Sequence, residues 1–438
     1  MKTNDLAQFI TSTVYHKLPE RVVEKAKLCF LDFLANTLRG SQTPSAQSVR
    51  AIIGNDDEST IIGGPRATAL DASLANGVSA HSLDLDDGHR LAHLHPGACV
   101  IPAALALCEA YDKSGKDLIN SIVVGYQIAI KLGMLINPEH RQCGFHSTGT
   151  CGTLGAASAA CKIMDLDDEA VLNALGLAGT QAAGLLESNH SGSMAKHLNS
   201  GKAAQNGVLS ALLAKDGFTG AHTIIEGNQG FISTMADPDL ANNQYPNIYP
   251  SSEEYEILRV YFKNYPVCRH LHSSLDAVLN LMTENKLKSN KISGVTIETY
   301  KIAAEHHDYH PKTEEAIKQS LPVSTAIAIV RGGLKLEDLH VDQSIAEITG
   351  KISIKCEKEL NKLYPIKRPS KVTIKTKNQS YTKRINLPRG EPEKPYNKND
   401  LINKFSDLNP HVELSVLDYL NHLDSLQIRD LMEVIREF

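Results

Sequence analysis

The first 250 residues consist largely of Ala-, Leu- and Gly-rich segments with helical spacing, and this pattern restricts the fold more than any other. In residues 19–40, apolar side chains recur at helical spacing until Gly40, a residue type that commonly ends helices. The same pattern predicts further helices over residues 67–80, 97–111, 118–135, 149–164, 169–183 and 201–215. Because small side chains let helices approach closely, we expect a packed multihelical core.

The pattern changes after about residue 255, where Lys becomes frequent and apolar and polar residues alternate. Residues 294–300 predict a strand, and residues 370–387, with the polar turn 377–380, predict a β-hairpin with one solvated face. Helices are predicted between them, over residues 314–334 and 336–351. The middle of the chain is therefore expected to form an α+β domain.

Residues 388–400 are rich in Pro, Gly and charge and predict a linker, after which the helical pattern resumes at Leu401. We therefore expect a mainly α protein, with a large multihelical domain built from both chain ends and a smaller α+β domain. The expected division is a helical domain at 1–258, an α+β domain at 259–392, and C-terminal helices at 393–438 that return to the helical domain.

The composition is that of a folded globular protein, with 42% hydrophobic residues and a formal net charge of −5 over 438 residues. This charge argues against binding of the whole protein to nucleic acid or to anionic lipid. The eight cysteines form no CxxC pair and predict free thiols in a reducing compartment. The N-terminus lacks the apolar core of a signal peptide, and the apolar residues 119–136 predict a buried helix, so we expect a cytoplasmic protein.

Two common phosphate-binding motifs are absent from the sequence. The glycines of residues 149–155 do not have G-x-G-x-x-G spacing, which argues against a dinucleotide-binding fold. The pair Gly201-Lys202 resembles the end of a P-loop, but Lys196 replaces its first glycine and Ala203 replaces its hydroxyl residue. The sequence therefore gives no sign of nucleotide binding by a dinucleotide-binding motif or by a P-loop.

The densest polar cluster, residues 81–97, contains four histidines together with Asp84, Asp86 and Asp87. His95 precedes a predicted helix, whose N-terminal dipole disfavours imidazolium and favours bound anions, so His95 suits acid–base chemistry on a carboxylate substrate. Alternatively, His89 and His93 are four positions apart and could bind a metal from one helical face, with Asp87 or His95 completing the site. In a third interpretation, the aspartates only cap the loop and the histidines are partly exposed.

Three further clusters contain candidate residues. His146 precedes a Ser/Thr/Gly loop that opens a helix, where backbone N–H groups could bind a carboxylate or Ser147 could merely cap the helix. Lys196 lies in a Ser/Gly-rich loop before another helix, where partial burial would require an anionic partner. Cys268 and Arg269 lie at the join of the two expected domains; Cys268 could be a nucleophile, but its base is not identifiable from the sequence.

Taken in order, these clusters resemble the MmgE/PrpD family, which includes 2-methylcitrate dehydratase, cis-aconitate decarboxylase and iminodisuccinate epimerase. The resemblance covers nearly the whole chain, including SLPVSTAIAIVRGG at 320–333 and PRGEPEKP at 388–395. It implies a homodimer in which the α+β domain is a lid and the active site lies in the cleft between the domains. It also implies a small carboxylate substrate, no required cofactor, and no nucleic acid or membrane partner.

Carried over position by position, the resemblance implies two sets of site residues and no metal ligand. The catalytic set is Asp84, His95, His146 and Lys196. The substrate-binding set is Lys263, Cys268, Arg269, His272, Gly88 and His89. The chain departs from the D-x-D-D-T-W-H pattern of the decarboxylases at residues 84–89, and it has Cys268 where they have histidine.

The expected chemistry is proton removal or addition next to a carboxylate, which forms an electron-rich intermediate that fixed cations and N–H donors must stabilise. Lys196 and Arg269 could stabilise it, and Asp84, His95 and His146 are candidates for the acid and the base. We expect a lyase similar to 2-methylcitrate dehydratase, with decarboxylation or epimerisation as alternatives. Two other classes remain open, namely a metal-dependent hydrolase that uses His89 and His93 and a non-catalytic scaffold.

Overall fold

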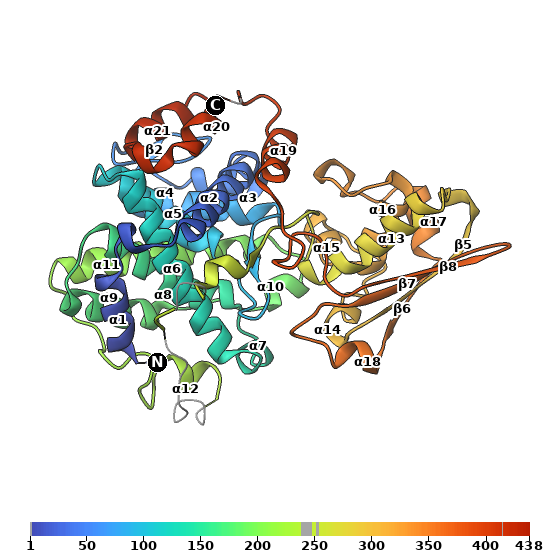
Figure 1. Ribbon diagram of the computed structural model, residues 1–438, viewed down its shortest axis with the longest axis horizontal. Coiled ribbons are helices and arrows are strands. Elements are labelled where there is room, and N and C mark those ends of the chain that lie inside the picture. The colour runs from blue at the N-terminus through green and yellow to red at the C-terminus, as the bar shows by residue number, and fades with distance from the viewer. Residues whose placement is uncertain (1, 238–247, 251–253, 414) are drawn as a thin grey trace.

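The computed structural model describes residues 2–237, 248–250, 254–413 and 415–438 and is mainly helical, as expected (Figure 1). Five helices pack around one centre: α4 (Ala69–Ser82), α5 (Gly97–Ala110), α6 (Gly115–Ile136), α8 (Ser147–Ile163) and α11 (Ala195–Lys215). Small residues bring their backbones together, since a Cβ atom on Gly77 of α4 would lie 2.8 Å from Cα of Gly201 in α11. The predicted close packing of small-residue helices is therefore confirmed.

Further elements surround this centre. From the N-terminal part of the chain these are α1 (Thr3–Ser12), α2 (Glu20–Gly40), α3 (Pro44–Arg50), β1 (Ser59–Thr60), β2 (Arg66–Ala67), α7 (Glu139–Gln142), α9 (Asp168–Gln181), α10 (Glu187–His190) and α12 (Phe231–Met235). From the C-terminus they are α19 (Lys398–Leu408), α20 (Val416–Asn421) and α21 (Ile428–Ile435). Figure 1 shows α19 to α21, in red, beside the blue N-terminal helices, and α19 packs on α2 while α21 packs on α5.

A second group of elements is built on a four-stranded sheet of order β6-β5-β7-β8. Its strands are β5 (Ile292–Thr299), β6 (Ile352–Cys356), β7 (Ser370–Thr376) and β8 (Ser380–Ile385), and its helices are α13 (His272–Glu284), α14 (Lys301–Ala304), α15 (Glu314–Lys318), α16 (Leu321–Arg331), α17 (Gln343–Thr349) and α18 (Lys358–Asn361). The predicted hairpin is confirmed, because β7 pairs with β8 antiparallel from Ser370↔Ile385 to Lys375↔Ser380. The predicted strand at 294–300 is β5, which pairs parallel with β6.

Two predicted helices of this group are interrupted. The helix expected over 314–334 is divided into α15 and α16, because the Ser320 side chain caps α16 by accepting from the Val323 N–H and Pro322 occupies its first turn. The helix expected over 336–351 is a short 3-10 turn followed by α17, which the Asp342 side chain caps. In both places a capping side chain starts a new helix inside an apolar run.

The described residues form two hydrophobic cores. The first runs from Leu6 to Phe262 and resumes from Tyr396 to Ile435, and we call the part of the chain that forms it the helical body. The second runs from Tyr265 to Ile385 and belongs to what we call the smaller body. The domain boundaries expected at 258/259 and 392/393 stay predictions. A short antiparallel pair, β3 (Gly88–His89) with β4 (Val260–Tyr261), ties the loop after α4 to the segment that leads into the smaller body.

Helix α6 is the one helix of the described residues that is long and apolar enough to cross a membrane. Its most apolar window is 83% buried inside the structure, as in the core helix of a folded domain. Polar contacts also hold it in place, since the Gln127 side chain donates to the carbonyl of Ile248 and accepts from the N–H of Glu256. The interpretation of this apolar segment as a buried helix is therefore confirmed.

Candidate active site

A cavity of about 150 Å³ lies where the loop after α4, the N-terminal ends of α8 and α11, and the smaller body meet. From the helical body its lining includes Asp84, His93, His95, Arg141, His146 and Lys196. From residue 263 onward its lining includes Lys263, Cys268, Arg269, His270, Glu305, His306, Asp308, Gln319 and Arg368. The cavity therefore brings together all four residues of the predicted catalytic set.

Asp84 is the central anion of the cavity and is almost fully buried. Its left-handed backbone, with φ of 52°, turns the chain directly after α4, a conformation that aspartate tolerates better than most residues. Oδ1 lies 2.7 Å from the Lys196 ammonium and 2.5 Å from that of Lys263, and Oδ2 accepts from the Gln319 amide at 3.1 Å. Lys196 belongs to the first turn of α11, not to the loop that the sequence predicted.

The two lysines set the ionisation of this group. Burial by itself would raise the pKa of Asp84, but the Lys196 and Lys263 ammonium groups more than offset it and hold the pKa well below its usual range. Burial lowers the pKa of Lys263, whereas the contact with Asp84 outweighs burial for Lys196 and raises its pKa. With both lysines protonated, the trio carries one net positive charge, which favours an anionic ligand.

His95 is held as a neutral imidazole just before α5. Its Nδ1 lies 2.6 Å from the backbone carbonyl of Asp87, and since a carbonyl can only accept, Nδ1 carries the proton and Nε2 keeps its lone pair. Burial lowers the pKa of His95 to about 3, although Asp86 opposes this shift. The hydrogen bond of Nδ1 therefore fixes the ring and leaves the Nε2 lone pair free, which is the geometry of a proton acceptor, while the low pKa makes this imidazole a weak base in the free protein.

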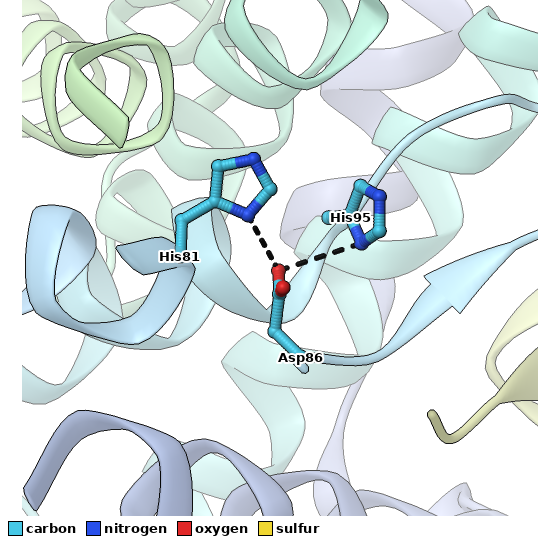
Figure 2. Close-up of side chains that lie close together, drawn as sticks. All are labelled: His81, Asp86 and His95. Atoms are coloured by element: carbon cyan, nitrogen blue, oxygen red, sulfur yellow. Dashed lines mark hydrogen bonds and ion pairs between the residues drawn. The ribbon is translucent and has the colours of Figure 1, made fainter. Parts of the chain in front are cut away.

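His81 and Asp86 lie next to the His95 ring and help to hold it in place. Oδ2 of Asp86 lies 2.8 Å from Nδ1 of His81 and 3.4 Å from Nδ1 of His95, and Figure 2 shows this carboxylate between the two rings. The ring centroids of the two histidines are 5.0 Å apart. Buried Nε2 of His81 and Oδ1 of Asp86 have no hydrogen-bond partner among the described residues.

In the described part of the chain, these three residues are also the one group of His, Cys, Asp or Glu side chains spaced closely enough to hold a metal ion. Their nitrogens do not fit a metal as they stand. Nδ1 of His81 faces Asp86, and Nδ1 of His95 donates to the Asp87 carbonyl, so both nitrogens nearest the carboxylate are engaged in hydrogen bonds. The arrangement suits the orientation of two imidazoles rather than ligation.

His146 is the N-cap residue of α8 and is buried. Its ring centroid lies 6.1 Å from that of His81, and Nδ1 lies 3.4 Å from the amide nitrogen of Asn199. Burial lowers the pKa of His146 well below its usual range, and His81 and Lys196 add to this effect. The cavity wall therefore contains several imidazoles that are neutral at pH 7.

Arg368 supplies a buried positive charge that forms no ion pair with the described residues, although Glu391 acts on it at longer range. Arg368 is only 3% exposed. One of its terminal nitrogens donates to the Arg90 carbonyl at 3.2 Å, and its Nε has no hydrogen-bond partner among the described residues. No ion pair to Arg368 is present in the described part of the chain. By contrast, Arg269, which also lines the cavity, pairs with Glu391 at 3.1 Å, and its predicted role in substrate binding stays a prediction.

Cys268 also lines the cavity, and the structure supplies the base that the sequence left unidentified. Its Sγ lies 3.7 Å from Nε2 of His306, whose Nδ1 lies 2.9 Å from the backbone carbonyl of Gln319. The sequence offered no signal for His306, because no motif surrounds it and tertiary structure alone brings it to Cys268. Arg368 and Gln319 were missed for the same reason.

Three predicted binding residues do not line the cavity. Gly88 packs against Tyr261, whose hydroxyl oxygen would lie 2.5 Å from an added Cβ, so glycine is required for the close approach of β3 and β4. His89 accepts from the Ala92 N–H through Nδ1, and its Nε2 lies 3.6 Å from Glu256. His272 contacts the Val267 carbonyl and the Arg269 guanidinium. These three residues support the backbone around the site.

The alternative metal site at His89 and His93 is wrong because the two residues are not on a helix. His89 is in strand β3, and His93 has a left-handed backbone with φ of 56°. The His93 ring packs edge-on against Tyr364, with the centroids 5.8 Å apart. The spacing of four residues therefore does not bring their nitrogens to one ion.

The two parts of the chain match the two domains of one known protein family. Residues 4–243 match the MmgE/PrpD N-terminal domain, and residues 265–414 match the MmgE/PrpD C-terminal domain. The cis-aconitate decarboxylase of Homo sapiens is 26% identical over 430 residues, which cover 92% of this chain and 86% of the relative. A cis-aconitate decarboxylase of Aspergillus terreus is 28% identical over 298 residues, 64% of this chain. The chain spans only 60% of the length of this fungal relative and 61% of a cis-aconitate decarboxylase-like protein, oryM, of Aspergillus oryzae, to which it is 29% identical.

Proposed function

Because this chain belongs to the MmgE/PrpD family, we propose that it is a lyase that removes CO₂ from a small unsaturated tricarboxylate of the cis-aconitate type. The names of its relatives support decarboxylation as the first reaction to test. The observation that carries the proposal is the charge of the cavity. Lys196 and Lys263 share the single carboxylate of Asp84, and buried Arg368 has no carboxylate partner among the described residues, so the cavity attracts a polyanion.

In this proposal the cationic side chains bind the substrate carboxylates and the imidazoles transfer protons. Lys196, Lys263 and Arg368 would hold the substrate carboxylates in place, since charged hydrogen bonds are the strongest available to them. Loss of CO₂ leaves an electron pair on the organic fragment, which a neighbouring carboxylate delocalises and the lysine ammonium groups stabilise. A proton must then reach the reacting carbon to complete the product.

Dehydration is the second candidate, and the geometry of His95 favours it. A dehydratase needs a base that removes a proton next to a carboxylate, and His95 has its Nε2 lone pair available while Nδ1 is held by the Asp87 carbonyl. The departures from the decarboxylase pattern at residues 84–89 and at Cys268 are the reason to test dehydration beside decarboxylation. Epimerisation needs the same proton removal followed by return to the other face.

Proton NMR in D₂O tests the proposal on the purified full chain. The substrates are cis-aconitate, trans-aconitate, citrate, 2-methylcitrate, itaconate, malate and iminodisuccinate, each with and without prior EDTA treatment of the protein. We expect loss of CO₂ from cis-aconitate, with activity that survives the chelator. Dehydration of 2-methylcitrate without decarboxylation would support the second candidate instead. No product and no deuterium exchange with any of these acids would contradict both.

The variant Lys196→Gln shows whether this cavity performs the reaction. Its matched control is Lys202→Gln in the same helix, because Lys202 is exposed and its ammonium group donates to the nearby Gln205. Full activity in Lys196→Gln would place the reaction elsewhere in the protein.

We also propose that the protein is a homodimer. Analytical ultracentrifugation of the same sample would measure its oligomeric state, and a monomer at micromolar concentration would contradict the proposal.

A further inference from the structure

Cys268 and His306 have the arrangement of an activated thiol. Nδ1 of His306 faces the Gln319 carbonyl at 2.9 Å and must carry a proton, because a carbonyl can only accept. Nε2 is therefore the nitrogen that faces the thiol, at 3.7 Å from Sγ. A thiol, an imidazole and a third group that orients the imidazole form the usual pattern of a thiol prepared for proton exchange.

The same pair is connected to the centre of the cavity. Gln319 holds His306 with its backbone carbonyl and Asp84 with its side-chain amide, so one residue positions both groups. Cys268 interacts electrostatically with the Lys196 ammonium, which favours a thiolate, and with the Asp84 carboxylate, which opposes it. Further titratable or charged groups near the pair are Arg141, His270, Tyr300 and Tyr364.

We propose that Cys268 and His306 form a proton-transfer pair of this cavity, in which the Cys268 thiol delivers a proton to the reacting carbon. This inference rests on the proposed lyase function. Cys268 reaches the cavity from the segment after β4, whereas His95 reaches it from the start of α5, so the two proton-transfer groups approach from different parts of the fold. A substrate held between them has an acid and a base at separate positions.

The proposed step conserves atoms and charge. The bond between the reacting carbon and the leaving carboxylate breaks, CO₂ departs, and the electron pair of that bond stays on the organic fragment. This carbanion takes the proton from Sγ of Cys268, which forms the new C–H bond and leaves a thiolate. A proton from water in the cavity then returns to the thiolate, which the His306 imidazole stabilises until then, so the pair begins the next cycle in its original state.

Electrostatics support this role. Burial opposes ionisation of the thiol, but His306 more than offsets it and lowers the pKa of Cys268 to about 7, while Cys268 raises the pKa of His306. An acid with a pKa near the working pH both holds and releases its proton readily. A cysteine in this position can therefore replace the histidine that the resembling decarboxylases have after the Pro of the second domain.

Alkylation of the full-length protein by iodoacetamide between pH 5 and 10 tests the pair without any substrate. Peptide mass spectrometry follows each thiol separately, since all eight cysteines are free and Cys356 is exposed as an internal reference. We expect the alkylation rate of Cys268 to rise with a midpoint near pH 7 in the wild type and at least one pH unit higher in His306→Gln. A midpoint that His306→Gln does not move would overturn the pair.

Turnover then tests proton delivery. We expect Cys268→Ala to lower kcat by about 10²-fold or more, with KM changed less, and Cys356→Ser to match the wild type. His306→Gln is expected to lower kcat and to shift the pH–kcat profile, a change that a purely structural role would not produce. If the wild type turns over a substrate and Cys268→Ala retains more than half of its kcat, proton delivery by Cys268 is wrong. If the wild type turns over none of the acids, the lyase function fails, whereas the alkylation result still decides whether the pair exists.

Discussion

The ammonium group of Lys196 lies 2.7 Å from Oδ1 of Asp84, and this contact depends on how closely two helices approach. Asp84 follows α4 and Lys196 begins α11, and the two helices meet at Gly77 and Gly201 with no room for a Cβ atom. The small residues therefore do more than fill the core. They bring a lysine and a carboxylate from distant parts of the chain to the same wall of the cavity.

Removal of the Lys196 charge is expected to lower kcat/KM without unfolding the protein. In Lys196→Gln, Asp84 retains its contacts with Lys263 and Gln319, so the carboxylate stays paired. Loss of one fixed cation that stabilises developing negative charge should cost about 10²–10³-fold in kcat/KM. Steady-state kinetics and thermal unfolding, with Lys202→Gln as the control, measure both effects. A loss below tenfold would mean that Lys196 does not contact the reacting part of the substrate.

For dehydration, the second candidate reaction, His95→Gln is expected to slow deuterium exchange next to the substrate carboxylate. Glutamine can still donate to the Asp87 carbonyl but has no ring nitrogen lone pair to accept a proton, so the rate should fall by about 10²–10⁴-fold. His222→Gln is the matched control, because the His222 side chain is 43% exposed. NMR exchange in D₂O gives the readout. Equal exchange rates in His95→Gln and the wild type would exclude His95 as the base.

Arg368→Gln is expected to weaken substrate binding more than it affects folding. The guanidinium donates to the Arg90 carbonyl, and although burial opposes its charge, Tyr261, Tyr300 and Glu391 raise its pKa, so its loss should lower the melting temperature only slightly. The substrate would lose a charged hydrogen bond worth about 1.5–3 kcal/mol, and KM should rise roughly 10–100-fold.

Arg90→Gln provides the contrast for Arg368→Gln. Arg90 pairs with Glu391 at 2.8 Å and with Glu393 at 2.7 Å, and Glu391 is fully buried. Loss of Arg90 should therefore lower the melting temperature and leave KM nearly unchanged. If Arg368→Gln instead behaves like Arg90→Gln, Arg368 has a structural role and does not bind substrate.

The buried histidines are expected to make folding stability fall as the pH drops from about 6.5 to about 4. Burial lowers the pKa of His89 and His95 to about 3 and that of His140 to about 4, from an ordinary value of 6.5. The unfolded chain therefore takes up these protons at higher pH than the folded protein, which favours unfolding by up to about 1.4 kcal/mol per pH unit for each histidine.

Three carboxyl groups act in the opposite direction. Burial raises the pKa of Asp32, Glu109 and Asp87, that of Asp87 to about 7, so the folded protein binds these protons more tightly than the unfolded chain does. They are outnumbered, because burial also lowers the pKa of five further histidines, namely His81, His93, His146, His270 and His272. Urea unfolding at pH 4.5, 5.5 and 6.5 measures the balance. A free energy of unfolding that stays constant or rises toward pH 4.5 would contradict the expected protonation states.

The sequence contained enough local information to predict the mainly helical fold and the family. Helical periodicity and hairpin alternation are properties of neighbouring residues, so the helices of the first 250 residues and the β7–β8 hairpin could be read directly. The order of the motifs identified Asp84, His95, His146 and Lys196, which all line the cavity. Capping at Ser320 and Asp342 was missed because a single side-chain hydrogen bond overrides the apolar pattern around it.

Tertiary structure alone decided which of the polar residues face one another. His89 and His93 have metal-like spacing, yet a strand and a left-handed residue separate their rings; His306 lies in no motif, yet folding places it beside Cys268. Sequence spacing reports direction only along one regular element, whereas the cavity is built from loops and helix ends of both bodies. The chain itself therefore determined its helices, its family and four site residues. Tertiary packing, within each body and between the two, decided the ion-pair partners, the histidine tautomers and the thiol–imidazole pair, because these depend on where loops and helix ends meet in space.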